Sequence, residues 1–239
     1  MFLGHYGLAL AAKRVAPETS LGSSVLAAQW ADLLWPLLLV TGLEHVRIVP
    51  GLMPASALDF VDYPISHSLV TVLAWGALVG GGYWLIKRRI RAAVVIAGLV
   101  VSHWLLDAVV HRPDLPLWPG SDVLVGGGLW QSVAVTVVLE LAVLAAGVVV
   151  YTRSTQPRDA AGRWGLRVMI LVLVSFFLSS FAAPPPSVDA LAYGGLTLWL
   201  FVPWAAWVDR HRGPAGARKP DEDLGDERHV DPMPSRSSG

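Results

Sequence analysis

The chain has 239 residues, of which 54% are hydrophobic and only 15% are charged, and its mean hydropathy is +0.54. A soluble domain carries about a quarter charged residues, so this composition indicates a membrane protein. The formal net charge is zero, which gives no electrostatic reason to expect a nucleic-acid partner, and a chain without cysteine has no thiolate metal site, disulfide or thiol nucleophile.

The first 16 residues form a unit of their own. Phe2 to Ala12 is apolar but too short to cross a bilayer, and Lys13 and Arg14 follow it. A signal peptide carries its positive charge before the apolar part, so we expect a retained helix that is either half-membrane or interfacial. If it descends from the midplane, His5 lies about 12 Å above the face at Lys13 and can meet other membrane residues. If it lies flat, His5 cannot reach them.

Long apolar runs occupy most of residues 17–211. A membrane-crossing helix needs about 20 mainly apolar residues. The sequence therefore predicts an all-α, polytopic bundle of about six transmembrane helices, at residues 21–41, 65–86, 92–110, 129–151, 165–183 and 191–208.

The basic residues are distributed unequally between the two sets of connections. One set has only Arg47 and Arg112. By the positive-inside rule, we expect both termini in the cytoplasm and the protein in the inner (plasma) membrane, with residues 212–239 as a disordered cytoplasmic tail. The other set carries Lys13, Arg14, Lys87, Arg88, Arg89, Arg91, Arg153, Arg158, Arg163, Arg167 and the basic residues of the tail.

The most informative motif is His103 with Asp107 inside the third apolar run. On a helix, residues four apart lie on one face, one turn from each other. Each would cost about 2–4 kcal/mol if it faced lipid alone, so both need partners. Imidazole with carboxylate at this spacing suits a divalent metal such as zinc, and the alternative is a structural His–Asp pair between helices. His111, one further turn along, is either on the same face or a solvated helix cap.

Three more polar residues lie in the membrane segments. His67 opens the second run, where Pro64 suits a helix start and Ser66 a cap; the alternative is an interfacial histidine. Asp32 is either a ligand or an acceptor for a neighbouring side chain. Glu140, near the centre of its run, is a ligand, a partner of a ligand histidine or a general base.

The order of these motifs resembles a known family. Gly4-His5, Ala31-Asp32, Ser66-His67-Ser68 and His103-x-x-x-Asp107 are similar to the bacterial inner-membrane metal-dependent hydrolases of the YdjM type, over about the first half of the chain. More distantly, the order resembles zinc-dependent phospholipase C and the single-strand-specific zinc nucleases, whose Trp-Ala-Asp matches Trp30-Ala31-Asp32.

The resemblance implies ligand roles. It assigns one metal to Asp32, His67, His103 and Asp107, and a second to His5 with Asp107 as a bridge. The soluble relatives also have a further histidine, a second His-x-x-x-Asp and a processed N-terminal amine as ligands. This sequence has no such pair after residue 111 and no cleavage signal before Met1, which argues against a three-metal site.

We therefore hypothesise a metal-dependent hydrolase, with zinc as the expected cofactor, acting on a phosphoester or lipid-like ester near the outer leaflet. In this hypothesis Glu140 or Asp107 accepts the proton of a metal-bound water. The rivals are a metal-ion or proton transporter or channel built on the same residues, haem ligation by His67 and His103, and a non-catalytic membrane protein. The sequence leaves the substrate and the oligomeric state open.

Overall fold

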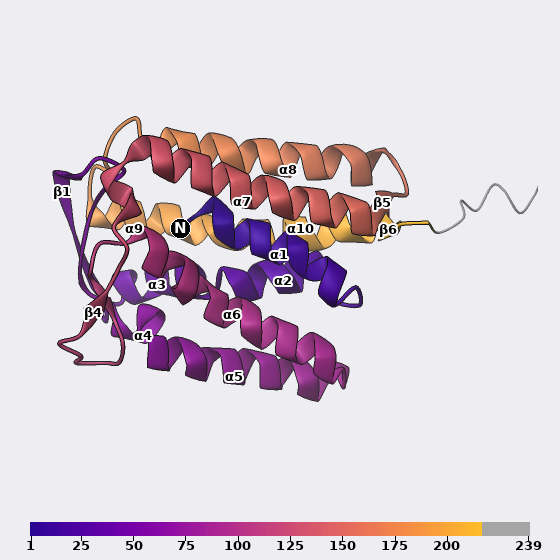
Figure 1. Ribbon diagram of the computed structural model, residues 1–239, viewed down its shortest axis with the longest axis horizontal. Coiled ribbons are helices and arrows are strands. Elements are labelled where there is room, and N and C mark those ends of the chain that lie inside the picture. Colours follow the sequence, from indigo (N-terminus) through magenta and orange to yellow (C-terminus); the bar gives the residue numbers. More distant parts are fainter. Residues whose placement is uncertain (217–239) are drawn as a thin grey trace, which may run out of the picture.

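The computed structural model describes residues 1–216, and it is a bundle of roughly parallel helices (Figure 1). Within these residues five segments are long and apolar enough to cross a membrane, or six if one bent pair counts as a single span. The all-α membrane-bundle prediction is thus confirmed. The five are α5 (Leu69–Lys87), α6 (Ile90–Val110), α7 (Val133–Ser154), α8 (Ala160–Ser179) and Val188–Arg210, which comprises α9 (Val188–Leu196), η2 (Thr197–Leu200) and α10 (Phe201–Arg210).

The first predicted span is broken. Residues 21–41 form α2 (Leu21–Ala28) and α3 (Trp30–Val40), which meet at an angle of 56°. The predicted span at residues 21–41 is therefore bent at Gln29, which lies between the two helices with φ −98° and ψ 8°, and the pair can still form one span. A break of this kind is tolerated in a membrane protein only where other groups satisfy the freed backbone. Here it leaves the Ala28 carbonyl available to a side chain from another helix.

The short N-terminal helix α1 (Leu3–Val15) lies inside the bundle, packed against α2, α6 and α7 (Figure 1). It does not lie flat, which agrees with the half-membrane alternative. The contact with α7 depends on two glycines. A Cβ on Gly7 would lie 2.5 Å from the Val143 carbonyl oxygen, and one on Gly147 would overlap the Gly7 carbonyl group. This close backbone approach brings α1, and His5 with it, into the centre of the bundle.

Short strands occur at both ends of the bundle (Figure 1). The first long loop forms an antiparallel hairpin, β1 (His45–Met53) with β2 (Ser56–Asp62), which sequence analysis did not predict. It leads into the single turn α4 (Pro64–His67), with Pro64 in the first turn as expected. At the same end lie η1 (Leu129–Gln131) and the pair β3 (Leu115–Pro116) and β4 (Leu124–Val125).

The opposite end carries β5 (Thr155–Pro157) paired with β6 (Arg212–Pro214). The prediction that disorder begins at Arg212 is therefore wrong for these three residues. Arg212 is buried, and its guanidinium donates to Thr155 and to the Gly162 carbonyl, which holds the strand in place. The rest of the predicted tail, from residue 217 onward, lies outside the described residues.

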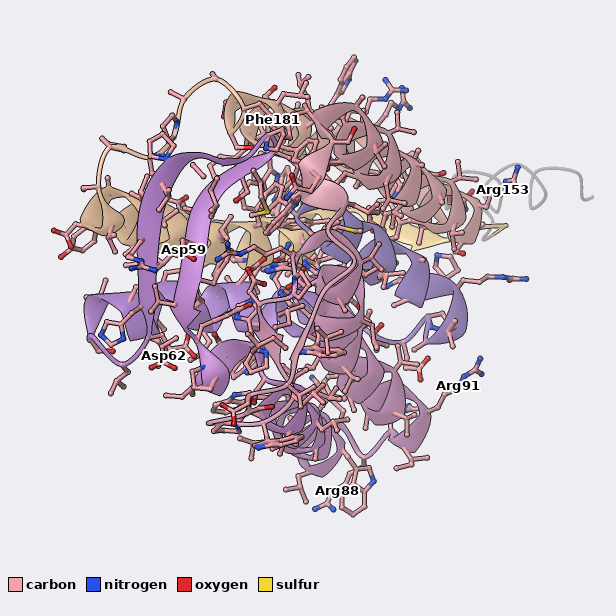
Figure 2. The ribbon with its side chains drawn as sticks, turned by 60° about the vertical axis from the view of Figure 1, so that its left-hand side comes forward. Asp59, Asp62, Arg88, Arg91, Arg153 and Phe181 are labelled. Atoms are coloured by element: carbon pink, nitrogen blue, oxygen red, sulfur yellow. The ribbon has the colours of Figure 1, made fainter. Side chains whose placement is uncertain are left out.

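Figure 2 shows how charge is distributed along the bundle. Asp59 and Asp62 lie on the β1–β2 hairpin, whereas Arg88, Arg91 and Arg153 lie toward the far end. The basic connections identified in the sequence therefore gather at the end remote from the hairpin. We call the end that carries the β1–β2 hairpin the hairpin end, and the end that carries these arginines the basic end.

Candidate metal centre

Five residues expected from the sequence to bind metal converge on one buried cluster: His5, Asp32, His67, His103 and Asp107. They come from α1, α3, α4 and α6. His103 Nε2 lies 3.1 Å from Asp107 Oδ2 and 3.6 Å from Asp32 Oδ1. His67 Nε2 lies 3.7 Å from the same Asp32 oxygen and 3.8 Å from Asp107 Oδ2, and His5 Nε2 lies 3.2 Å from Asp107 Oδ1. We call these five residues the inner cluster.

The inner cluster contains two overlapping sets of potential ligands. One is His5, His103 and Asp107, and the other is Asp32, His67 and His103. In each set one nitrogen or oxygen atom per residue lies within 4.8 Å of the others, a spacing at which a single ion can contact all three. His103 belongs to both sets, so the two positions are adjacent.

A backbone carbonyl orients the His103 ring. Its Nδ1 lies 2.8 Å from the Ala28 oxygen, at the break between α2 and α3. A carbonyl can only accept, so Nδ1 carries the hydrogen. In the neutral ring Nε2 then carries no hydrogen, and its lone pair faces the carboxylates of Asp107 and Asp32. Consistent with this, Nε2 has no hydrogen-bond partner despite its short distance to Asp107.

A relay of two side chains orients His67 in the same way. Ser66 donates its hydroxyl hydrogen to Glu44 Oε2 at 2.5 Å, so its oxygen is left to accept from His67 Nδ1 at 2.7 Å. Glu44 also accepts the backbone N–H groups of Ile65 and Ser66. The relay directs the Nε2 lone pair of His67 toward Asp32 and Asp107. Partners that fix the tautomer are typical of histidines that bind metals.

Glu44 lies outside the membrane-spanning helices and is almost completely buried. Burial raises its pKa, and the hydrogen bonds from Ser66 and Ile65 oppose that rise. The predicted helix cap at Ser66 is wrong, because Ser68 caps α5 and the Ser66 hydroxyl is used by Glu44 and His67. No role for Glu44 was predicted. Their spacing in the chain carries no signal for this contact, because the loop and hairpin between them bring the two together.

The ring of His5 stacks on the ring of His103, with centroids 3.7 Å apart and planes 7° apart. Two positively charged imidazoles would repel each other at this separation. Both ring nitrogens of His5 are buried without a hydrogen-bond partner. A buried polar atom without a partner costs about 1–3 kcal/mol, which a bound ion would recover.

The inner cluster has an excess of negative charge. Within the described residues no lysine or arginine pairs with Asp32 or Asp107. The amino group of Met1 donates to Asp107 Oδ1, which compensates part of that charge. The remaining negative charge and the aligned histidine lone pairs together favour a cation.

Glu140 lies beside the cluster but in neither ligand set. Its two oxygens accept the backbone N–H groups of Phe2 at 2.7 Å and Gly4 at 2.9 Å. It therefore satisfies the free N–H groups at the start of α1, and so helps to place His5. Of the three roles considered from the sequence, this geometry favours a supporting or proton-accepting group over a direct ligand.

A cavity of about 710 Å³ reaches the cluster from the hairpin end, and both Asp32 and Glu140 line it. The side chain of Asp32 is 24% exposed, whereas that of Asp107 is only 2% exposed. A molecule in the cavity can therefore contact the inner cluster at Asp32.

His111 does not join the inner cluster, and it is not a solvated cap because it is only 3% exposed. Its Nδ1 lies 3.0 Å from Asp114 Oδ1, and Asp114 also accepts from Tyr63 and Arg112. Arg112 in turn donates to Asp59. We call these five residues the outer cluster.

Comparison with known proteins adds no assignment, because the chain matches no family model, no curated protein and no solved structure.

Proposed function

We propose that the protein is a membrane-embedded metal-dependent hydrolase that acts on a phosphoester or lipid-like ester at the hairpin end, with zinc as the ion. The observation that carries the proposal is the orientation of two histidines. His103 and His67 are each fixed at Nδ1 by an acceptor, and each directs Nε2 at the same pair of carboxylates. Zinc is bound by such nitrogen and carboxylate ligands.

The alternative of a purely structural cluster fits this arrangement poorly. A neutral Nε2 cannot donate to Asp107 or Asp32, so lone pairs would face lone pairs in a buried site. Protonating His103 would supply a donor, but its Nε2 lacks hydrogen-bond geometry toward Asp107 even at 3.1 Å. An ion between these atoms resolves both difficulties.

In the proposed reaction, the inner cluster would hold a divalent ion, which would supply an activated water and polarise the ester or phosphoryl oxygen. Asp32, which is the exposed member of the cluster, faces the substrate side. Glu140 also lines the cavity and is the better placed proton acceptor, because Asp107 is enclosed by Met1, His5 and His103. The resemblance to inner-membrane metal-dependent hydrolases points to the same activity.

Metal analysis and an activity panel test the proposal together. Purified wild-type protein should contain about one to two equivalents of zinc per chain. It should also cleave at least one member of a panel of chromogenic phosphodiesters and esters, and lose that activity with a chelator. His103→Ala should lose both metal and activity. The matched control is His45→Ala, because the His45 side chain is 61% exposed and belongs to neither ligand set. Equal metal content in wild type and His103→Ala would refute the proposal.

A transporter remains the rival class, and access to the site separates the two. A transporter must connect its binding site alternately to both faces. A second cavity, of about 400 Å³, lies at the basic end beside Lys87 and Arg89, and it shares no lining residue with the cavity that reaches the cluster. Access from the hairpin end is sufficient for hydrolysis, because the substrate of a hydrolase needs to reach the ion from one side only. Zinc or proton uptake by proteoliposomes that is lost in Asp107→Ala, with no cleavage of any ester, would favour the transporter.

We also propose that the hairpin end faces outside the inner membrane and that both termini are cytoplasmic. The basis is the gathering of arginines at the basic end (Figure 2). The chain has no cysteine, so single cysteines can be introduced for labelling. A cysteine at Ala57 should react with a membrane-impermeant reagent in intact cells, and one at Arg88 should react only after permeabilisation. The reverse pattern would overturn the orientation.

A further inference from the structure

The cavity above the inner cluster lies between α3, α7, α8 and α9, with the β1–β2 hairpin across its top. Phe181, in the connection after α8, lies beside that hairpin (Figure 2). Its volume of about 710 Å³ is within the 300–1,000 Å³ typical of ligand pockets. Phe176 of α8 also lines the cavity and is 44% exposed. One wall of the cavity is therefore formed by a helix long and apolar enough to span the membrane.

The walls of this cavity are apolar. They include Phe2, Trp35, Phe177, Phe181, Leu191 and Leu198. Three of the hydroxyl groups among the lining residues are used locally, because Thr136, Ser179 and Ser180 each donate to a carbonyl of the preceding turn. The fourth, that of Ser56, accepts from the Leu58 N–H. The walls thus offer few directional polar groups that could recognise a sugar or a nucleobase.

The ionisable residues that line the cavity are Asp32 and Glu140, both of them acids. Within the described residues no lysine or arginine lines it. A ligand with several negative charges would therefore be repelled, because only the proposed ion could compensate them. A ligand with one charged or polar ester group and a hydrocarbon remainder would match both the acidic floor and the apolar walls.

We propose that the cavity binds the hydrocarbon chain of a membrane amphiphile that carries a single phosphodiester or carboxylic ester group. The ester lies at Asp32 and Glu140, and the chain lies along α8 and α9. This inference deepens the proposed function and rests on it for the position of the reacting group. It excludes diphosphates and nucleotides as substrates.

Gly194 on α9 provides a way to block the cavity without disturbing the backbone. It lines the cavity, and a Cβ built on it meets no atom within 4 Å. Gly194→Leu should therefore fill space that the chain would occupy. Gly82→Leu is the matched control, because Gly82 is also helical and open on α5 but does not line the cavity.

Binding is measured without turnover, using a hexadecyl phosphonate monoester with bromines on its chain, which quenches tryptophan fluorescence. Trp35 and Trp130 line the cavity and report on it. Wild type and Gly82→Leu should show saturable quenching that unbrominated ligand competes away. Gly194→Leu should weaken the affinity at least about tenfold, equivalent to about 1.4 kcal/mol. Equal affinity in Gly194→Leu and Gly82→Leu would overturn the inference.

Turnover of short and long substrates separates this inference from the proposed function. Methyl and hexadecyl members of one chromogenic ester series are compared. Gly194→Leu should lose far more activity toward the hexadecyl than toward the methyl substrate, so that its chain-length preference falls below that of wild type and Gly82→Leu. Metal-dependent cleavage with an unchanged chain-length preference would refute the cavity assignment and leave the hydrolase standing. Saturable chain binding that Gly194→Leu weakens, without cleavage of any ester, would support the cavity and refute the hydrolase.

Discussion

The inner and outer clusters contain the same kinds of side chain in different electrostatic settings. In the outer cluster, Asp114 accepts from His111, Tyr63 and Arg112, so its carboxylate is paired with a permanent cation. In the inner cluster, Asp32 and Asp107 have no lysine or arginine partner within the described residues, and the Nε2 atoms of His5 and His103 have no hydrogen-bond partner. The outer cluster is complete as a structural network, whereas the inner cluster, in which the Met1 amino group compensates one of the two carboxylates, needs a further cation.

This difference matters because short sequence spacing does not separate the two. His103 and Asp107 are four residues apart, and His111 and Asp114 are three apart; both pairs are buried. What distinguishes them is the third partner, an arginine in one case and a second carboxylate in the other. Four measurements test this comparison, starting with the largest expected effect.

Zinc should stabilise the protein through the inner cluster alone. At a free zinc concentration of about 100 times Kd, a ligand that binds only the folded state adds about 2.7 kcal/mol. We expect the thermal midpoint of detergent-solubilised wild type and of His111→Gln to rise with zinc, and that of His103→Gln not to change. A zinc-dependent rise in His103→Gln equal to that of wild type would remove the distinction between the clusters.

The relay behind His67 should control metal affinity. Ser66→Ala removes the acceptor of His67 Nδ1–H, and loss of such a partner typically weakens metal binding by about 10–100-fold. Ser68→Ala is the control, because the Ser68 hydroxyl caps α5 at Thr71 and is not the partner of His67 Nδ1. Competition with a fluorescent zinc chelator measures both affinities. Equal affinities for the two variants would show that the relay has no such role.

Without metal, the two clusters should respond oppositely to loss of a carboxylate. Asp114→Asn weakens the hydrogen bonds from His111, Tyr63 and Arg112, each worth on the order of 1 kcal/mol, so the thermal midpoint should fall. Asp32→Asn removes one of two neighbouring negative charges, so the midpoint of zinc-free protein should stay the same or rise. A larger fall in Asp32→Asn than in Asp114→Asn would contradict a cluster that needs a cation.

The smallest expected effect is a pH dependence from His111, which lies just beyond the end of α6. Burial lowers its pKa below the ordinary value of 6.5, although Asp114 opposes that shift. The folded state therefore binds fewer protons than the unfolded state, so stability present above about pH 6.5 is lost as the pH falls below it. Thermal midpoints of zinc-free protein between about pH 5.5 and 7.5 should show a shallower slope in His111→Gln than in wild type. An identical slope would assign the dependence to other groups.

The ligand set illustrates how far sequence reasoning reached. The apolar surroundings of Asp32, His103 and Asp107 indicate that each needs a partner, because an unpaired charge in a membrane segment is costly. The structure brings all three together as expected, with His67 and His5. Glu44 and Ser66 could not be assigned from the pattern, since a serine and a glutamate in a loop carry no comparable cost when exposed.

The break at Gln29 is another feature that the sequence does not indicate. No glycine or proline lies at residues 28–30, so propensity alone continues the helix. The His103 ring at the Ala28 carbonyl is a tertiary contact, and it comes from a residue 75 positions away. The hairpin at residues 45–62 was also not predicted. Its strands are defined by backbone pairing with register shifts and not by a long alternation of apolar and polar residues.

The sequence by itself determined that the chain forms a helical membrane bundle, because runs of about 20 apolar residues leave each helix no other way to satisfy its backbone and bury its side chains. It also determined which polar residues had to find partners. Only the tertiary structure decided which partners they found. The close contact of Gly7 with Gly147, the bend at Gln29 and the Glu44–Ser66 relay set the positions of His5, His103 and His67. These positions depend on contacts between segments far apart in the chain, and local spacing carries no information about them.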